Sequence, residues 1–217
     1  MKRYEFDLSL SAQKLFFPEE RVKTKLQVID ILMEATRYML ANPTIAKTNI
    51  TGKLVLLVDR MSRLFFFKEG KHYSIVFPFL VSEIEGTLHF SFQNNLEVDS
   101  QLISNTISTI SCDSFKDKCS LDFIEPIYDY ENEFDDNFWI FLRELLLNED
   151  GYIRYDRDEK SYQEAKEKGE EHKHPLNHFD VFYSSNATFK LGLHSESAEE
   201  QLIDLLNTKT DCKYLRE

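Results

Sequence analysis

The sequence predicts an α+β fold, with a mostly antiparallel sheet flanked by about three to four helices. Residues 53–93 are rich in β-forming residues and are interrupted only by short turns, which indicates consecutive antiparallel strands. Apolar residues with helical spacing occur both before and after this region. The short connections between these consecutive strands and the flanking helices together predict the α+β class.

The chain is predicted to begin with a strand and a helix. Apolar and polar residues alternate from Tyr4 to Leu10, which is the period of a half-buried strand. Between residues 21 and 40 the apolar positions recur at three- and four-residue steps, and Asn42-Pro43 ends this helical pattern.

The β-rich region is predicted to form a meander, because its apolar runs are joined by short turns such as those at Gly70 and Gly86. Residues 98–110 mix apolar side chains with many Ser, Thr and Asn residues, which suits a helix or a strand, and we favour a helix. The expected strands of the meander are residues 54–58, 64–67, 72–80 and 87–92.

The second half of the chain is predicted to alternate between helices and short strands. A broad apolar face indicates a helix at residues 134–147, and Ser197 with Glu200 fits the capping box of a final helix at 197–207. Residues 156–171 are so polar that we expect an exposed loop or a frayed helix. The expected strands are residues 121–127 and 152–155, followed by a hairpin of 179–183 with 188–193.

Composition favours one cytoplasmic domain spanning residues 1–217, with a possible C-terminal subdomain at 151–217. The apolar runs are too short to span a bilayer, and the first residues lack the apolar block of a signal peptide. The odd number of cysteines, with no C-x-x-C pair, fits a reducing compartment better than a disulfide framework. These cysteines are Cys112, Cys119 and Cys212.

Negative charge is concentrated in one segment of the chain. The formal net charge is −12, and residues 121–150 hold ten acids against one base, Arg143. Because phosphate backbones are bound through Lys and Arg, direct nucleic-acid binding is not expected unless a metal ion intervenes. A basic protein partner, or a role in solubility alone, is the expectation for this segment. The candidate partner-binding acidic face consists of Asp129, Glu131, Glu133, Asp135 and Asp136.

Three of the six histidines lie within seven positions, at residues 172–178. His174, His178 and Asp180 are candidate ligands of a divalent metal ion, because neutral imidazoles and carboxylates bind transition metals and Pro175 creates a turn between the histidines. Asp156 or Asp158 is a further candidate oxygen ligand.

A structural role is the alternative for the same residues. In that interpretation His178 begins a strand with its ring hydrogen-bonded in the core, while His172 and His174 lie in a solvated loop. The histidines lack the closed, cysteine-containing spacing that is typical of structural zinc sites.

Asp180 and Lys190 also suggest a metal-dependent nuclease, in which carboxylates hold the ion and a lysine on the adjacent strand orients the attacking water. Glu171 or Asp156 is the candidate second carboxylate. The match is incomplete, because Thr188 stands two residues before Lys190 where such enzymes have an acid.

Other classes of chemistry lack their signatures. The six glycines are too far apart for a nucleotide-binding loop, which argues against a P-loop hydrolase or a nicotinamide-dependent enzyme. Ser184-Ser185 lies near His178 without a G-x-S-x-G elbow, so these serines suit a hairpin turn better than nucleophilic catalysis.

Residues 174–181, His-Pro-Leu-Asn-His-Phe-Asp-Val, and the segment 183–193 resemble the C-terminal signature of bacterial domain-of-unknown-function families. The resemblance covers the chain from Gly151 onward. It implies a cytoplasmic bacterial protein, encoded near mobile-element or antiphage defence genes, and it implies no catalytic residues.

The favoured function from sequence is a non-catalytic cytosolic interaction or regulatory subunit that contacts a protein partner through its acidic face. The alternative is a metal-dependent hydrolase or nuclease that uses His174, His178 and Asp180. The sequence leaves the cofactor open: it has no nucleotide- or dinucleotide-binding motif, and a divalent metal ion is the candidate that the residue pattern suggests.

Overall fold

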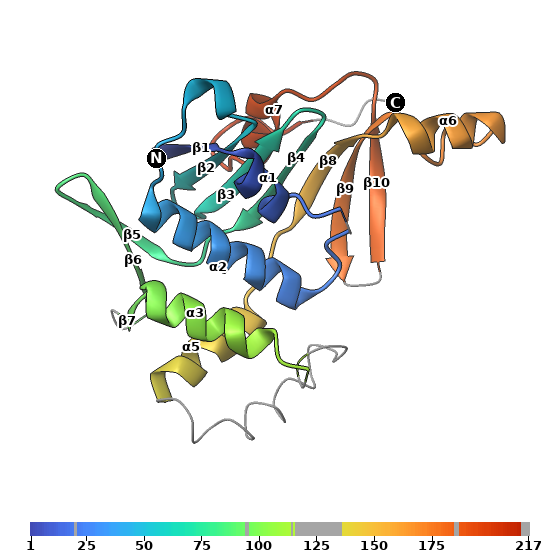
Figure 1. The fold of residues 1–217 in the computed structure, drawn as a ribbon. Coiled ribbons are helices and arrows are strands. Elements are labelled where there is room, and N and C mark those ends of the chain that lie inside the picture. Colours follow the sequence, from blue (N-terminus) through green and yellow to red (C-terminus); the bar gives the residue numbers. More distant parts are fainter. Residues whose placement is uncertain (20, 94–95, 114, 116–135, 185–186, 214–217) are drawn as a thin grey trace.

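The computed structural model describes the chain except residues 20, 94–95, 114, 116–135, 185–186 and 214–217. The fold is α+β, as the sequence predicts: a seven-stranded antiparallel sheet is accompanied by a three-stranded one (Figure 1). The large sheet has the order β1 (Lys2–Leu8), β2 (Gly52–Val58), β3 (Arg63–Lys68), β4 (Lys71–Val76), β8 (Ile153–Arg157), β9 (Asn177–Ser184) and β10 (Ala187–Leu193). The small sheet consists of β5 (Leu80–Ile84), β6 (Thr87–Phe92) and β7 (Leu96–Glu97).

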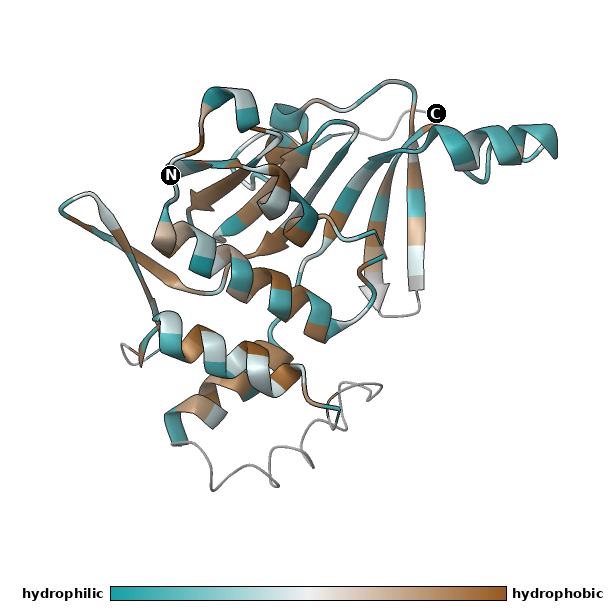
Figure 2. Ribbon diagram, viewed as in Figure 1, coloured by the Kyte–Doolittle hydropathy of each residue, from teal (hydrophilic) through white to brown (hydrophobic). Residues whose placement is uncertain are grey.

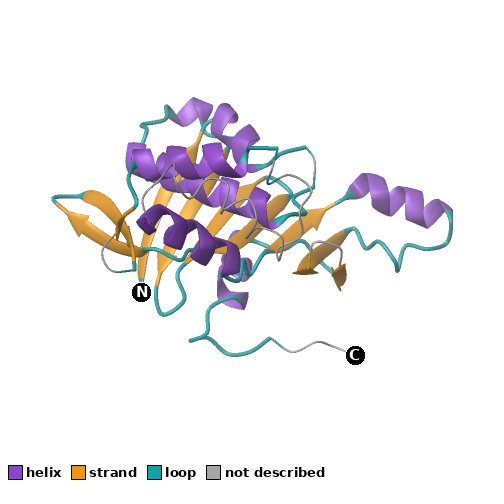
Figure 3. Cartoon of the chain, turned by 90° about the horizontal axis from the view of Figure 1, so that it is seen from below, coloured by secondary structure: helices purple, strands orange, loops and turns teal. Residues whose placement is uncertain are grey.

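Helices cover only part of the large sheet. α1 (Leu10–Phe16) and α2 (Lys25–Ala41) lie over β1–β4, and α3 (Ser100–Ile110) and α5 (Asp136–Leu147) pack beside α2 (Figure 1). In Figure 3, α6 (Glu159–Glu167) lies at one side, away from the main layer of helices. The short helix α7 (Glu199–Leu205) packs against the opposite face of the sheet.

The central strands are apolar on both faces because a core lies on each side. Leu54, Phe66 and Ile75 point into the larger core beneath α1 and α2. Alternate residues such as Val55 and Phe65 join the smaller core, which α7 closes with side chains that include Leu202. Burial on both faces explains the nearly continuous apolar runs of β2 and β3.

The face that carries the larger core becomes polar where it continues onto β8, β9 and β10. Tyr73 of β4 pairs with Arg154, which pairs with Asp180, which pairs with Lys190, so these side chains follow one row across the sheet. Figure 2 shows hydrophilic segments on these outer strands beside the more hydrophobic central ones. The fold therefore places a row of charged residues next to its main core.

Two strand predictions need correction. The strand expected at residues 4–10 ends at Leu8, because the Ser9 hydroxyl accepts a hydrogen bond from the backbone N–H of Ala12 at 3.3 Å and caps α1. The single strand expected at 72–80 is interrupted at residues 77–79, which include Pro78, and β5 then joins the other sheet. Proline cannot donate a ladder hydrogen bond, which is a sufficient reason for this break.

Two helix predictions are refined. Residues 159–167 of the polar stretch form a helix capped by the Asp158 carboxylate, which accepts from the backbone N–H of Ser161 at 2.9 Å. The predicted capping box of Ser197 with Glu200 is wrong: α7 begins after Ala198, whose backbone N–H donates to the Gln201 side chain at 2.8 Å. The helices expected at 21–40, 98–110 and 134–147 correspond to α2, α3 and α5.

The strand expected at residues 121–127 lies outside the described residues. In the part of the chain that the structure describes, no helix combines the length and apolar character needed to cross a membrane. Cys112 and Cys212 are free thiols, and Cys119 lies outside the described ranges.

Candidate functional site

The candidate site is built on two neighbouring rows of the large sheet. In the first row, Arg154, Asp180 and Lys190 stand opposite one another on β8, β9 and β10. In the second row, Asp156 stands opposite His178. Because directly paired residues point to the same face, the pairing register alone brings all five side chains together.

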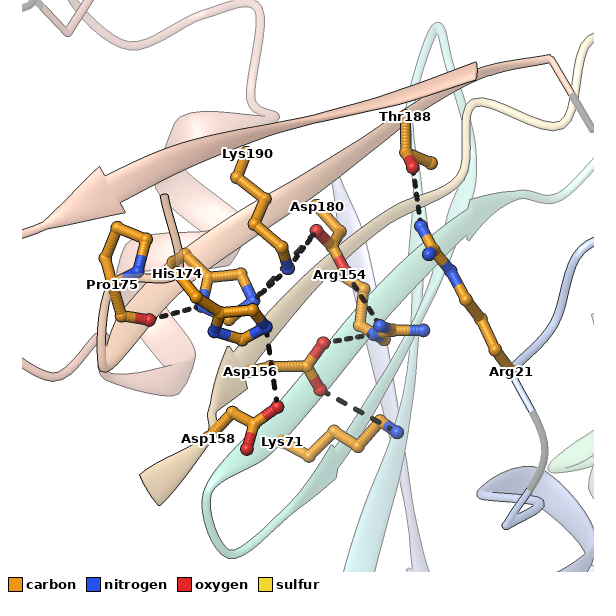
Figure 4. Close-up of polar contacts among 11 residues, drawn as sticks. Arg21, Lys71, Arg154, Asp156, Asp158, His174, Pro175, Asp180, Thr188 and Lys190 are labelled. Atoms are coloured by element: carbon orange, nitrogen blue, oxygen red, sulfur yellow. Dashed lines mark hydrogen bonds and ion pairs between the residues drawn. The ribbon is translucent and has the colours of Figure 1, made fainter. Parts of the chain in front are cut away.

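Asp180 lies at the centre of the first row, with only 2% of its side chain exposed. One carboxylate oxygen accepts a hydrogen bond from Arg154 Nη2 at 2.8 Å, and the other accepts from Lys190 Nζ at 2.9 Å (Figure 4). Arg154 also donates from Nε to Asp156 Oδ2 at 2.5 Å. Arg154 therefore connects the two carboxylates, and Asp180 has a cation on each side.

Hydrogen bonds fix the tautomer of His178, whose side chain is 1% exposed. Its Nδ1 lies 2.8 Å from the carbonyl oxygen of Pro175, which only accepts, so Nδ1 carries the proton. In the neutral ring Nε2 is then an acceptor, and it accepts from Lys190 Nζ at 2.7 Å. An imidazole held through Nδ1–H by a backbone carbonyl, with Nε2 directed into the site, has the arrangement typical of metal-ligating histidines.

The Pro175 carbonyl is held in place by a tight contact between β10 and the loop that precedes β9. A Cβ atom at Gly192 would lie 2.9 Å from Pro175 Cγ, so only glycine lets the loop approach so closely. The His174 ring packs against His178 edge to face, with 4.9 Å between centroids. His174 Nε2 faces Asp158 at 3.7 Å, and its Nδ1 is buried without a hydrogen-bond partner.

The surroundings set the charge state of each group. Burial disfavours the charge of Asp180, but the hydrogen bond and charge of Lys190, together with Arg154, outweigh burial and lower the pKa of the carboxyl. Burial likewise opposes the charge of Arg154, yet Asp156 raises the pKa of the guanidinium. Burial lowers the pKa of His178. At neutral pH the site therefore holds an ionised Asp180 beside a neutral imidazole.

Asp156, His178 and Asp180 offer three metal-ligand atoms that all lie within 4.8 Å of one another. His178 Nε2 and Asp180 Oδ1 are 4.0 Å apart, and the Lys190 ammonium lies between them. A metal ion bound to both atoms at about 2.0–2.2 Å would lie close to the line between them, too near the Lys190 ammonium for the two cations to be present together. The donor set thus suits a divalent cation, provided that Lys190 turns aside.

The structure brings together only some of the residues that the sequence suggests as metal ligands or catalytic groups. His178 and Asp180 share the site with Asp156 and Lys190, the other pair that the sequence suggests. His174 lies beside His178, with Nε2 directed toward Asp158. Glu171 is exposed in the preceding turn. Of the acidic face, Asp136 is an exposed residue of α5, whereas Asp129, Glu131, Glu133 and Asp135 lie outside the described residues.

Arg154 and Lys71 are two residues of the site that were not predicted from the sequence. Arg154 connects the two carboxylates, and Lys71 Nζ lies 3.7 Å from Asp156 Oδ1. The sequence did hold a partial signal for Arg154: it stands two residues after Tyr152 on the predicted strand 152–155, so both side chains point to one face. Asp156 continues this alternation just beyond the predicted strand, and an arginine that becomes buried is usually paired with a carboxylate.

Comparisons with models of known protein families, with curated proteins and with solved structures gave no match. The resemblance of the C-terminal third to bacterial domain families, and the cytoplasmic location that it implies, therefore stay predictions. The function of this chain is therefore inferred from the geometry and chemistry of its candidate site.

We expect His178→Ala to destabilise the fold by about 1–3 kcal/mol, because it removes a buried ring with two hydrogen bonds and leaves the Pro175 carbonyl without its donor. His172→Ala is the matched control. Its side chain is exposed in the same loop, and the substitution should cost less than about 0.5 kcal/mol. Urea denaturation of both variants measures the difference, and equal costs would contradict the assigned role of His178.

Proposed function

We propose that this protein is a metal-dependent hydrolase of phosphate esters. Asp156, His178 and Asp180 hold the divalent ion, and Lys190 acts beside it. The observation that carries the proposal is the preset His178 ring, whose unprotonated Nε2 lies 4.0 Å from the ionised Asp180 carboxylate. This nitrogen accepts from Lys190 in the metal-free protein, and displacement of the ammonium would leave it ready to bind a metal ion.

The donor set supports a metal that accepts mixed ligands. Two carboxylate oxygens and one imidazole nitrogen suit Mn²⁺, and also Zn²⁺ or Fe²⁺, while Mg²⁺ prefers oxygen ligands alone. When bound, the ion polarises a water molecule or a phosphoryl oxygen. Arg154 donates to both carboxylates and so holds them in position.

Lys190 has two roles in this proposal. Its side chain is 29% exposed, so the ammonium has a route away from the ligand atoms toward solvent. Once displaced it stays next to the ion, where it stabilises negative charge on the phosphoryl group or the leaving oxygen. Because Asp180 and Asp156 already have cationic partners, a divalent ion leaves the site strongly positive, and metal binding should strengthen when an anionic substrate is present.

Charge also defines the class of substrate. Arg154, Lys71 and Lys190 outnumber the two carboxylates even without metal, which favours a phosphate over a neutral ester or amide. The net charge of −12 opposes long polyanions such as duplex DNA. Small phosphate esters and short single strands are therefore the favoured substrates.

The function favoured from sequence, a non-catalytic interaction subunit with an acidic face, stays a prediction. Four of the five residues proposed for that face lie outside the described ranges, so the structure adds no contact that supports it. The hydrolase is preferred to the interaction subunit because the three residues proposed to hold its metal ion lie together in the structure.

Hydrolysis of bis(p-nitrophenyl) phosphate and of short single-stranded oligonucleotides, with Mn²⁺ or Mg²⁺, tests the proposal. We expect turnover that EDTA abolishes and that Asp180→Asn reduces by at least about 100-fold, because a metal ligand is lost. His172→Ala, a control in the same loop, should keep full activity. Equal rates in the parent and Asp180→Asn proteins, or no turnover of any phosphate ester with either metal, would refute the proposal.

A further inference from the structure

An open groove of about 530 Å³ adjoins the candidate site. Its walls come from the β3–β4 turn, from β8, from the start of α6 and from the loop before α2. Arg154 and Asp156 belong both to this groove and to the site. A volume in this range fits a ligand the size of a small phosphate ester.

Two lysines face each other at the end of the β3–β4 hairpin, which is electrostatically unfavourable. Lys68 and Lys71 stand directly opposite each other, and like charges in such a pair destabilise a sheet. Lys68 is placed over the Phe17 ring at 5.0 Å, and Lys71 has only a long contact of 3.7 Å to Asp156. An anion between the two lysines would offset the repulsion between their charges.

Arg21 adds a third cation from a distant part of the chain. It donates from Nη2 to Thr188 Oγ1 at 2.7 Å and lies 4.9 Å from the centre of the Phe182 ring. Arg154 lies over the same ring at 5.5 Å. Figure 4 shows the Arg154 guanidinium between the side chains of Lys71 and Arg21. Among the described carboxylates, none forms an ion pair with Arg21 or Lys68.

Carboxylates also line the groove, and three of them have partners in the fold. Asp156 accepts from Arg154 at 2.5 Å and lies 3.7 Å from Lys71. Asp158 caps α6, and Glu159 pairs with Arg157 at 2.6 Å. Glu19 and Glu69 line the groove and are exposed. Arg21 and Lys68 are therefore the cations with donors left for a ligand, and Arg154 and Lys71 share theirs with Asp156.

We propose that this groove binds a second phosphate group of the substrate, held by Arg21, Lys68, Lys71 and the outer edge of Arg154. The inference rests on the proposed function and narrows it to compounds with two neighbouring phosphates, one at the metal site and one in the groove. Side-chain cations supply the contacts that a glycine-lined loop makes in other phosphate-binding proteins.

Binding of inorganic pyrophosphate without metal, in EDTA and at low salt, tests the groove by calorimetry. We expect saturable binding that Arg21→Ala and Lys68→Ala each weaken about tenfold, since each removes charge-assisted hydrogen bonds. Lys166→Ala, which removes an equal charge on the exposed face of α6, should change affinity less than about twofold. Circular dichroism confirms that the exposed variants fold, and Arg21→Lys should recover part of the affinity.

ADP and a single-stranded trinucleotide separate the two sources of neighbouring phosphates, a diphosphate ester and a phosphodiester chain. Tighter binding of either one supports the groove and identifies the source. Unchanged affinity in both alanine variants, or no saturable binding of any probe by the parent protein, overturns the inference. The parent protein separates the groove from the proposed function: pyrophosphate binding in EDTA without hydrolysis of phosphate esters in Mn²⁺ or Mg²⁺ keeps the groove and refutes the hydrolase, whereas metal-dependent hydrolysis without saturable pyrophosphate binding refutes the groove alone.

Discussion

Asp180→Ala is expected to lower the free energy of unfolding by about 3–5 kcal/mol, because the change leaves the buried Arg154 guanidinium without one of its two carboxylates. Lys190 loses its carboxylate partner at the same time. A buried ion pair adds little net stability compared with an apolar pair, but removing one partner alone is costly.

Urea denaturation at neutral pH measures this cost. Glu200→Ala is the control, since Glu200 forms an exposed ion pair with Arg3 at 2.9 Å and should cost no more than about 1 kcal/mol. If the two variants lost similar stability, Asp180 would not be the centre of the charged row.

The pH dependence of stability should identify the same carboxyl. The pKa of Asp180 is lowered in the folded protein, so the unfolded chain binds a proton more readily. Its contribution is therefore complete above the unfolded pKa of about 3.9 and is lost as the pH falls through the lower folded value. Asp180→Asn should flatten this part of the stability profile. An unchanged acid limb would contradict the assignment.

Local patterns predicted most of the fold. The apolar stripes of α2 and α5 and the turns of the meander have short-range signals, and they were placed correctly. α1 was missed because the alternating strand pattern continues to Leu10, which is in fact an exposed helical residue. α6 carries no buried residue, so no apolar stripe marked it.

Only those residues of the site that lie on the β9–β10 hairpin could be placed near one another from the sequence. The sequence placed Asp180 and Lys190 on adjacent strands of one hairpin, but their direct pairing depends on a register shift between Ala187 and Thr188 that the sequence did not predict. Their contacts with Arg154 and Asp156 depend on β8 pairing with β9, and Lys71 joins through the pairing of β4 with β8. Such long-range registers have no local signal, which is why Arg154 and Lys71 escaped notice. His174 was predicted as a ligand, but its Nε2 is directed toward Asp158.

Lys190→Ala is expected to tighten Mn²⁺ binding by about tenfold or more, because it removes a cation from between two of the three ligand atoms. The same variant should hydrolyse phosphate esters more slowly, since the group that stabilises negative charge is gone. A purely structural salt bridge predicts no change in Mn²⁺ binding, because without metal ligation the substitution changes stability alone. Lys173→Ala, which removes a charge from an exposed ion pair with Glu170, is the control.

Calorimetric titration of Mn²⁺ into the parent, Lys190→Ala and Asp180→Asn proteins tests the metal site most directly. We expect one Mn²⁺ ion per chain, with weak binding in the parent protein. Binding should be about tenfold tighter in Lys190→Ala and absent in Asp180→Asn. Absence of Mn²⁺ binding in both the parent and Lys190→Ala proteins, or binding that Asp180→Asn leaves unchanged, would contradict the proposed metal site.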